Sequence, residues 1–204
     1  MKTIMGKELY SVKEAYWIFY RGVRTMKFMI KAKRHNDFDM QKIERIMLAV
    51  TEVNGCAVCS YAHTKMALEA GISHEEIHNL LTGDFDTGPK AEMTGVLFAQ
   101  HYADSRGNPS QASWENVKTE YGHETALGIL GAIRVIMIGN TYGIPWSSFF
   151  NRFKGKADPR SSLGYELSMM TVGTLLIPFA LVHAAVASLM KQPVIAFPAA
   201  KQVS

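Results

Sequence analysis

The sequence predicts an all-α protein with a single domain over residues 1–204. Apolar side chains recur at steps of three and four residues along several segments, which is the period of one helix face. No segment shows the convincing alternation of apolar and polar residues that a half-buried strand requires. Hydrophobic residues make up 48% of the 204 residues and charged residues 20%, so the composition favours one globular core over a disordered chain.

The first predicted helix lies within residues 1–35 and is amphipathic. The apolar side chains of this segment that share one face are Leu9, Val12, Tyr16, Phe19, Val23, Met26 and Ile30. Such a stripe packs against a core or against another subunit. The polar sequence His-Asn-Asp at residues 35–37 interrupts the pattern.

A second and a third helix are predicted on either side of a short turn. The second spans Asp39 to Val53 and buries Ile43, Ile46, Met47 and Val50. The dipeptide Asn-Gly at residues 54–55 is a stop signal. The third helix is then expected to begin at about Cys56, run to Glu69 and end at Gly71.

The fourth predicted helix begins with a capping box. Ser73 and Glu76 have the spacing at which a hydroxyl and a carboxylate each accept a hydrogen bond from exposed amides of the first turn. The helix is expected to end near Leu81, before a Thr-Gly-Asp turn. His74 and His78 are four residues apart on this helix, which permits a metal pair, but no further ligand accompanies them and a solvated surface is the favoured interpretation.

Three further helices are predicted over residues 90–105, 113–121 and 124–142. Ser113 is the expected N-cap of the second of these helices. Gly143 and Pro145 are expected to end or kink the third helix, because proline cannot supply a backbone N–H to a helix.

Residues 167–190 form a long segment without Asp, Glu, Lys or Arg. Its length would span a bilayer, and Pro178 is expected to kink or interrupt it. Polar and small residues lower the mean hydropathy of this segment. A helix buried inside a homo-oligomer is also apolar on all of its faces, so the composition does not by itself indicate a membrane. We therefore favour a buried helix over a membrane span and expect no membrane partner.

Charge and cysteine usage indicate a cytoplasmic protein without a nucleic-acid partner. The net charge is +4, and the clustered basic residues are Arg21, Arg24, Lys27, Lys31, Lys33 and Arg34, followed later by Arg152, Lys154, Lys156 and Arg160. Without a docking motif or stacking aromatic residues, these clusters are interpreted as solvated faces. The first ten residues carry three charges and no long apolar run, which argues against a secretory signal. Two cysteines in one close pair are not a secreted disulfide framework.

The chemistry of the chain is expected to reside in its only two cysteines. Cys56 and Cys59 are followed by His63, four residues beyond the second thiol, and preceded by Glu44 on the second predicted helix. A helix N-terminus favours the thiolate, which is the reactive form. Cys59 and His63 share one helix face, so the imidazole can take and return the thiol proton, and Glu44 is placed to orient that imidazole.

A thiol pair of this kind can be oxidised by a peroxide. One thiolate becomes a sulfenic acid, the neighbouring thiol condenses with it to form a disulfide, and an external dithiol reduces the disulfide by exchange. Two alternatives stay open at this point. The four side chains are acceptable zinc ligands, although three of them lie so close on one helix that they make a poor tetrahedron. The cysteines are alternatively inert core residues beside a hydrogen-bonded histidine.

The pattern formed by Glu44 and residues 56–63, Cys-Ala-Val-Cys-Ser-Tyr-Ala-His, resembles the alkylhydroperoxidase D-like group of the carboxymuconolactone decarboxylase family. Residues 53–56 and 62–67 are similar to that group as well. The resemblance covers roughly residues 38–150. It leaves the helix within residues 1–35 and a C-terminal extension over residues 155–204 outside the similar region.

The resemblance implies an all-α fold that assembles as a homo-oligomer, commonly a trimer or a hexamer, and redox chemistry without a bound cofactor. It implies that Cys59 is the peroxidatic thiol, that Cys56 is the resolving thiol, and that His63 and Glu44 form a proton relay. The chain departs from the best-known peroxidases of the group at Val58, where they carry another histidine. The lactone decarboxylases of the family lack the thiol pair, so decarboxylation is disfavoured.

The sequence therefore predicts a thiol oxidoreductase that acts on a small-molecule peroxide or a disulfide. Its expected reductant is an external dithiol of the lipoyl or thioredoxin-like kind. The alternative is a non-catalytic redox sensor, or a membrane-associated protein, whose thiol pair switches its assembly. Catalytic turnover with a dithiol separates the enzyme from the sensor.

Overall fold

A computed structural model of the chain describes residues 7–34, 38–84 and 88–197, and within these ranges it is all-helical. The elements, in chain order, are α1 (Val12–Lys33), α2 (Met40–Asn54), α3 (Ala57–Glu69), α4 (His74–Thr82), the 3₁₀ helix η1 (Lys90–Glu92), α5 (Met93–Asp104), α6 (Gln111–Arg152), α7 (Leu163–Ser168), the π-helix η2 (Met169–Gly173) and α8 (Ile177–Leu189). The predicted all-α class is confirmed. The break expected at residues 35–37 lies outside the described residues.

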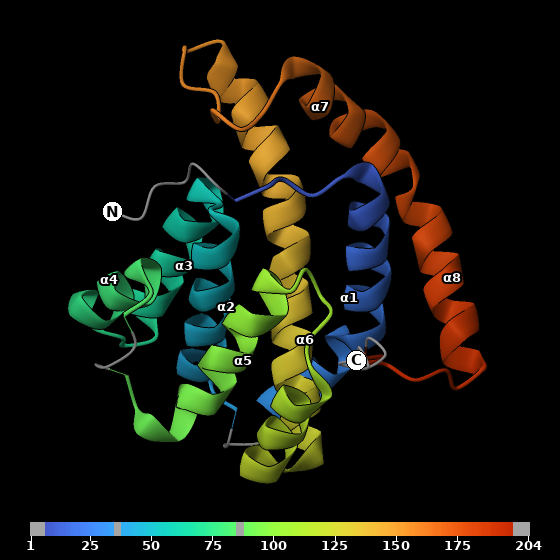
Figure 1. Cartoon of the computed structure of the whole chain (residues 1–204). Helices are drawn as coiled ribbons and strands as arrows, with labels where there is room; N and C mark the ends of the chain where they lie inside the picture. Colours follow the sequence, from blue (N-terminus) through green and yellow to red (C-terminus); the bar gives the residue numbers. More distant parts are fainter. Residues whose placement is uncertain (1–6, 35–37, 85–87, 198–204) are drawn as a thin grey trace, which may run out of the picture.

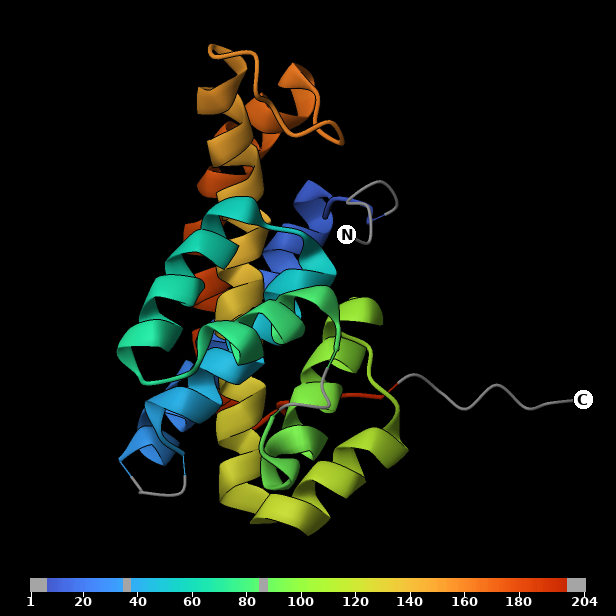
Figure 2. The same cartoon turned by 90° about the vertical axis from the view of Figure 1, so that its left-hand side faces the viewer.

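The long helix α6 runs through the middle of the molecule, as Figure 1 shows. Helix α1 packs along one side of α6, whereas α2 and α5 pack on the other, and α3 and α4 lie outside α2 (Figure 1). Helix α8 covers the outer side of α1. The C-terminal end of α6 projects beyond the bundle and carries α7 beside it (Figure 2). The thiol helix α3 and the last helix α8 therefore lie on opposite sides of the molecule.

The main core fills the space between α1, α2, α5 and α6. Its largest fully buried side chains include Leu48 of α2, Tyr102 of α5 and Ile133 of α6. Helices α1 and α6 approach each other closely because α6 carries glycine at the contact. A Cβ atom on Gly131 would lie 2.8 Å from the Thr25 carbonyl oxygen of α1, so no larger residue fits without displacing the α1 backbone.

Helix α6 differs from the predictions in its N-cap, in its continuity and in where it ends. Ser110, rather than Ser113, is its N-cap, since the Ser110 hydroxyl accepts a hydrogen bond from the Ser113 N–H. The two helices predicted over 113–142 form one element with an interruption at Gly122, whose φ of 76° is readily adopted only by glycine. Gly143 and Pro145 do not end the helix, which continues to Arg152. Pro145 is buried there, and this packing offsets the missing hydrogen bond.

The predicted capping box of α4 is only half formed. The Ser73 hydroxyl accepts a hydrogen bond from the Glu76 N–H at 3.1 Å, as expected. The Glu76 carboxylate instead accepts from the Arg45 guanidinium of α2 at 2.6 Å, because a buried cation competes more strongly for it than a backbone amide. A complete capping box occurs at α1, between Ser11 and Glu14.

The apolar segment 167–190 is not one helix. It is divided among the end of α7, η2 and α8. The part formed by α7 and η2 is bent by 50° relative to α8, at a break before Pro178. This proline lies in the first turn of α8, where its ring is tolerated. By length and composition, two parts of the described chain could cross a membrane, namely α6 and this bent pair. Most of the apolar window in α6 is buried as the core helix, whereas α8 leaves much of its surface exposed.

The chain after α8 returns to the core and holds that helix in place. Arg24 of α1 donates hydrogen bonds to the carbonyl oxygens of Gln192 and Pro193 at 2.5 and 3.1 Å. Arg134 of α6 donates to the carbonyl oxygen of Val194 at 2.7 Å, and burial lowers the pKa of its guanidinium. Arg24 is buried, so the first basic cluster is not simply the solvated face that was predicted.

Candidate functional site

The junction between α2 and α3 places both cysteines at a helix N-terminus. Gly55 ends α2 with a φ of 66°, in the left-handed region that favours glycine, and the chain then reverses direction. Cys56 is the N-cap of α3, and its sulfur accepts a hydrogen bond from the Cys59 N–H at 3.4 Å. The α3 helix dipole and its exposed N–H groups therefore favour negative charge on these sulfurs.

The two cysteines are joined in a disulfide, with their Cα atoms 5.3 Å apart. Cys56 is only 1% exposed and Cys59 is 8% exposed, so Cys59 is the more accessible of the two. A three-residue separation at the start of a helix thus lets the sulfurs reach each other without unfolding α3. Both sulfurs of the cysteine pair therefore lie within one turn of the chain, so the disulfide can form and break there.

His63 and Glu44 lie in direct contact. The His63 Nδ1 atom is 2.8 Å from the Glu44 Oε2 atom, and both side chains are largely buried. An ionised carboxylate only accepts hydrogen bonds, so the Nδ1–H donates to Glu44 and the lone pair is left on Nε2. Cys59 and His63 are one turn apart on α3, which brings the imidazole to the same helix face as the Cys59 thiol. The structure therefore joins Cys56 to Cys59 and His63 to Glu44, and it places Cys59 and His63 one helical turn apart on α3.

Gly143 of α6 forms the wall behind the sulfurs. A Cβ atom at this position would lie 3.1 Å from the Cys59 sulfur, 3.2 Å from the Cys56 sulfur and 3.2 Å from the Val58 side chain. From the sequence, Gly143 was expected only to end or kink its helix. Trp146 and Phe150 follow on α6 one and two turns later, are exposed, and stack with ring centroids 6.0 Å apart. They extend an apolar surface beyond Gly143.

Arg160, in the loop between α6 and α7, fastens the turn that precedes Cys56. Its guanidinium donates to the carbonyl oxygens of Asn54 at 3.1 Å and Gly55 at 2.9 Å, and it pairs with Asp158 at 2.7 Å. Burial raises the pKa of Asp158, but the hydrogen bonds from Arg160 outweigh it and leave that pKa below the usual value. The prediction that Arg160 lies on a solvated face is wrong, because its guanidinium binds carbonyl groups of residues more than 100 positions away.

Arg152, from the same basic cluster, is also engaged. Its guanidinium donates to both oxygens of the fully buried Glu166 carboxylate, at 2.6 and 2.9 Å. Glu166 accepts further hydrogen bonds from the hydroxyls of Ser148 and Ser161. This network joins α7 to the projecting end of α6 and so holds the loop that carries Arg160.

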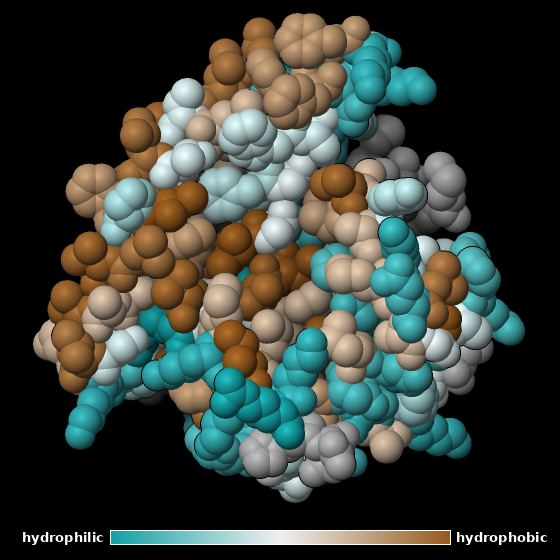
Figure 3. Space-filling view, turned by 180° about the vertical axis from the view of Figure 1, so that it is seen from behind, coloured by the Kyte–Doolittle hydropathy of each residue, from teal (hydrophilic) through white to brown (hydrophobic). Residues whose placement is uncertain are grey.

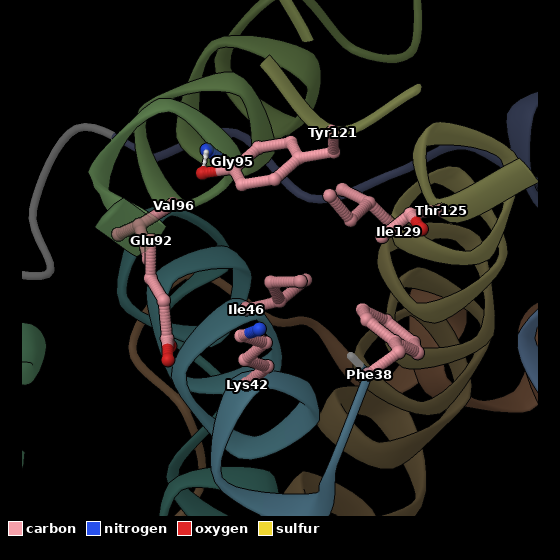
Figure 4. Close-up of a pocket in the computed structure, with 9 residues that line it drawn as sticks. All are labelled: Phe38, Lys42, Ile46, Glu92, Gly95, Val96, Tyr121, Thr125 and Ile129. Carbon is pink, nitrogen blue, oxygen red and sulfur yellow. Dashed lines mark hydrogen bonds between the residues drawn. The ribbon is translucent and has the colours of Figure 1, made fainter. Parts of the chain in front are cut away.

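A separate recess lies between α2, α5 and α6 (Figure 4). It is lined by Phe38, Lys42, Ile46, Glu92, Gly95, Val96, Tyr121, Thr125 and Ile129. Its mostly apolar interior holds about 20 Å³, which is room for roughly one water molecule. None of the thiol-site residues lines it, and it is too small for an organic substrate. Burial raises the pKa of Glu92 at its edge, against the lowering effect of Arg45.

Across the described ranges, no three His, Cys, Asp or Glu side chains are grouped in a way that could hold a metal ion. His74 and His78 are exposed on α4. The zinc alternative for the thiol site therefore gains no support from the side-chain positions.

Within the described residues, an all-helical fold carries a cysteine pair at the N-terminus of α3 and, between α3 and α2, an imidazole in contact with a carboxylate. Residues 19–100 match the model of the carboxymuconolactone decarboxylase family, which includes alkylhydroperoxidase D-like proteins, and this match bears out the predicted resemblance. The match begins within α1 and ends within α5, and it contains all four site residues. No curated protein and no solved structure matches the chain at a significant level.

Proposed function

We propose that the protein is a thiol-dependent oxidoreductase that reduces peroxides, or exchanges disulfides, through Cys56 and Cys59. The observation that carries this proposal is the contact between His63 Nδ1 and Glu44 Oε2, on the same helix face as a bonded cysteine pair. An inert buried cysteine pair would not require an oriented imidazole with a free Nε2 lone pair one turn away. The match of residues 19–100 to a family that includes peroxidases supports the same proposal.

The first half of the proposed reaction oxidises Cys59. Nε2 of His63 takes the proton of the Cys59 thiol, and Glu44 stabilises the resulting imidazolium. The thiolate attacks one oxygen of the peroxide, the O–O bond breaks, and the leaving alkoxide receives the proton from His63. The products are an alcohol and a sulfenic acid on Cys59. The greater exposure of Cys59 supports its role as the attacking thiol.

The second half forms the disulfide and then reduces it. The Cys56 sulfur attacks the sulfur of the sulfenic acid, and the hydroxyl group leaves as water with the proton from Cys56. Two thiols and one peroxide thus give one disulfide, one alcohol and one water. An external dithiol then reduces the disulfide by exchange and is itself oxidised. We propose a lipoyl or thioredoxin-like reductant in the cytoplasm, where such dithiols keep thiol pairs reduced.

Steady-state peroxide consumption with excess dihydrolipoamide tests the proposal. The wild type should consume many equivalents of an alkyl hydroperoxide per subunit, and Cys59→Ser should consume none. Cys56→Ser should turn over more slowly than the wild type, because the external dithiol must then condense with the Cys59 sulfenic acid itself. His63→Gln should be slowed at least tenfold because its base is removed. His78→Gln, an exposed histidine on α4, is the matched control and should behave as the wild type.

The same experiment distinguishes the alternative. Formation of one disulfide per subunit without further peroxide consumption, even with excess dithiol, would contradict the enzyme and favour a redox sensor. The burial of both sulfurs is the observation that would then gain weight, because it restricts access for an external reductant. Absence of any oxidation would show that the cysteines are structural.

A further inference from the structure

Helix α1 has different neighbours on two of its sides. Helix α8 covers one side, and the exposed apolar side chains of α8 gather along the left-hand edge of the view in Figure 3. On another side, α1 faces the loop of residues 105–110 that joins α5 to α6 (Figure 1). Arg21 of α1 donates a hydrogen bond to the Gly107 carbonyl oxygen of this loop at 3.0 Å. A recess opens between α1 and the loop, beside this contact.

The recess is large enough for a small organic molecule. It is lined by Trp17, Ile18 and Arg21 of α1 and by Ser105, Arg106 and Asn108 of the loop, together with Glu14 near the start of α1. Its volume is about 420 Å³, which lies within the range of about 300–1,000 Å³ that is usual for ligand sites. None of the four residues of the thiol site lines it.

Arg21 gives the recess a positive charge that no carboxylate balances. Its guanidinium has five N–H groups, and within the described residues its one hydrogen-bond acceptor is the Gly107 carbonyl oxygen. The other cation of the recess, Arg106, is balanced, because its Nε donates to the Glu14 carboxylate at 2.7 Å. This hydrogen bond is the main cause that lowers the pKa of Glu14 from 4.5 to about 2, so Glu14 is ionised at neutral pH. The uncompensated charge that faces the recess is therefore that of Arg21.

Two buried arginines behind Arg21 add to the positive field. Arg24 and Arg134 are 7% and 3% exposed, and in the part of the chain that the structure describes they donate only to neutral oxygens. The Arg24 Nε atom is buried and has no hydrogen-bond partner there. Burial is the main cause that lowers the pKa of Arg134, and the nearby charges of Arg21 and Arg24 lower it further.

The loop contact shows how close Arg21 lies to this buried pair. Arg134 donates from Nε to the Tyr102 hydroxyl oxygen at 2.7 Å. A Cβ atom on Gly107 would lie 2.7 Å from the Arg21 Nη1 atom and 3.5 Å from that same Tyr102 oxygen. Buried charges are costly unless an opposite charge compensates them. Of these three arginines, Arg21 alone lines the recess, so the recess is where an anion can approach the cluster.

Trp17 gives the recess a fixed aromatic wall. Its side chain is 39% exposed, and edge-to-face contacts hold its ring against Tyr20 and His183, with centroids 5.4 and 5.6 Å apart. Trp17 and Arg21 are four residues apart on α1, so their Cβ atoms are about 5–6 Å apart on one helix face. A ligand whose anionic group meets Arg21 can therefore place a directly attached ring against Trp17.

We propose that this recess binds a small aromatic carboxylate, whose carboxylate group accepts hydrogen bonds from Arg21 and whose ring packs against Trp17. The planar guanidinium fork matches the two oxygens of a carboxylate. A phosphate group presents three acceptor oxygens and more charge, which suits a site with several free donors better than a site with one arginine. The proposal goes beyond the redox function and does not depend on it, because the recess and the thiol site share no residue.

Isothermal titration calorimetry of the full chain at low ionic strength tests the proposal, with 2-naphthoate as the probe. The wild type should bind one 2-naphthoate per chain. The neutral 2-naphthamide has the same ring and nearly the same shape, and it should bind at least tenfold more weakly because it lacks the charge that meets Arg21. The same titration with 2-naphthyl phosphate distinguishes the two kinds of anion, and this compound should bind more weakly than 2-naphthoate.

Variants locate the binding site. Arg21→Gln should weaken the binding of 2-naphthoate at least tenfold, and Arg21→Lys, which keeps the charge but not the fork, should weaken it less. Lys27→Gln removes the same charge from an exposed position of α1 outside the recess and should bind as the wild type does. Trp17→Leu should weaken binding, whereas Trp146→Leu, at a position on α6 that is also 39% exposed, should not.

Three results would each overturn the proposal: no binding at millimolar 2-naphthoate, equal affinities for 2-naphthoate and 2-naphthamide, or an unchanged affinity in Arg21→Gln. Tighter binding of 2-naphthyl phosphate than of 2-naphthoate would overturn the assignment to carboxylates. Circular dichroism checks that each variant keeps its helical content. If Arg21→Gln does not fold, the comparison of acid with amide on the wild type, together with Trp17→Leu, still decides the matter.

Discussion

Adding one methyl group to the wall behind the sulfurs should make the disulfide easier to reduce. In Gly143→Ala the new Cβ atom would lie 3.1 Å from the Cys59 sulfur and 3.2 Å from the Cys56 sulfur. Ordinary contacts between heavy atoms are about 3.5–4.0 Å, so the sulfurs or α6 must move by a few tenths of an ångström. Overpacking of this kind costs about 1–3 kcal/mol.

Most of that cost should fall on the oxidised state. The bond between the sulfurs holds both of them against Gly143, whereas in the reduced protein each thiol can rotate away independently. If about 1.4 kcal/mol is specific to the disulfide, the reduction potential becomes less negative by roughly 30 mV. The gain in helix propensity from glycine to alanine, about 1 kcal/mol, is common to both states and cancels.

The assay is equilibration with glutathione or dithiothreitol redox buffers, followed by alkylation of free thiols and mass measurement. Gly139→Ala is the control, because the same change one turn earlier on α6 places the new Cβ atom 3.7 Å from the nearest side-chain atom, an ordinary contact. Its potential should equal that of the wild type. Equal shifts in the two variants, or a more negative potential for Gly143→Ala, would refute the reasoning.

Two further predictions concern buried carboxylates. Glu44→Gln should lower the rate of peroxide consumption at least tenfold and change its pH profile. The reason is that the amide neither fixes the Nδ1–H form of His63 nor stabilises its cation. An unchanged pH profile would show that Glu44 has no part in proton transfer. The hydrogen bonds from Arg152 lower the pKa of Glu166 from 4.5 to about 2, so its ionised form stabilises the fold above pH 4.5 and this contribution is lost as the pH falls towards 2. After allowance for solvent around Arg152, the free energy of unfolding of the wild type should fall by about 2 kcal/mol over that pH interval, as measured by urea unfolding. The Glu166→Gln variant should not show this loss. Parallel pH dependences of the two proteins would contradict the stabilising role of ionised Glu166.

The helical class and the composition of the site were accessible from the sequence because both depend on short-range patterns. Apolar spacing identified the segments that became α1 and α2, stop and capping signals identified those that became α3 and α4, and helical geometry placed His63 on the Cys59 face. The Asn-Gly stop signal located the N-terminus at which the cysteines lie. These features are encoded within a few turns of chain.

The parts that sequence reasoning missed depend on contacts between distant segments. Local propensity predicts that Gly143 ends or kinks a helix, yet Gly143 lies inside α6, where that helix packs against the disulfide. Arg160 reads as a solvated cation, yet it binds carbonyl groups at the end of α2. Glu76 has the spacing of a capping box, but Arg45 of another helix takes its carboxylate. Local signals do not contain these partners.

An interruption of the C-terminal segment was predicted from Pro178, but the path of its pieces was not. Hydropathy alone does not show that the break lies at residues 174–176, ahead of Pro178 in the first turn of α8. What determines the path is the packing of the buried alanine face of α8 on α1 and the binding of residues 192–194 by Arg24 and Arg134.

The most direct test of the central claim asks which sulfur attacks the peroxide. Reduced Cys56→Ser and Cys59→Ser would each be mixed with one equivalent of an alkyl hydroperoxide and dimedone, which traps sulfenic acids, and the adduct would be located by peptide mass spectrometry. We expect a rapid adduct on Cys59 in the Cys56→Ser variant and none on Cys56 in the Cys59→Ser variant. The rate of the Cys59 adduct should fall at least tenfold when His63→Gln is added. A faster adduct on Cys56, or a Cys59 rate that does not depend on His63, would contradict it.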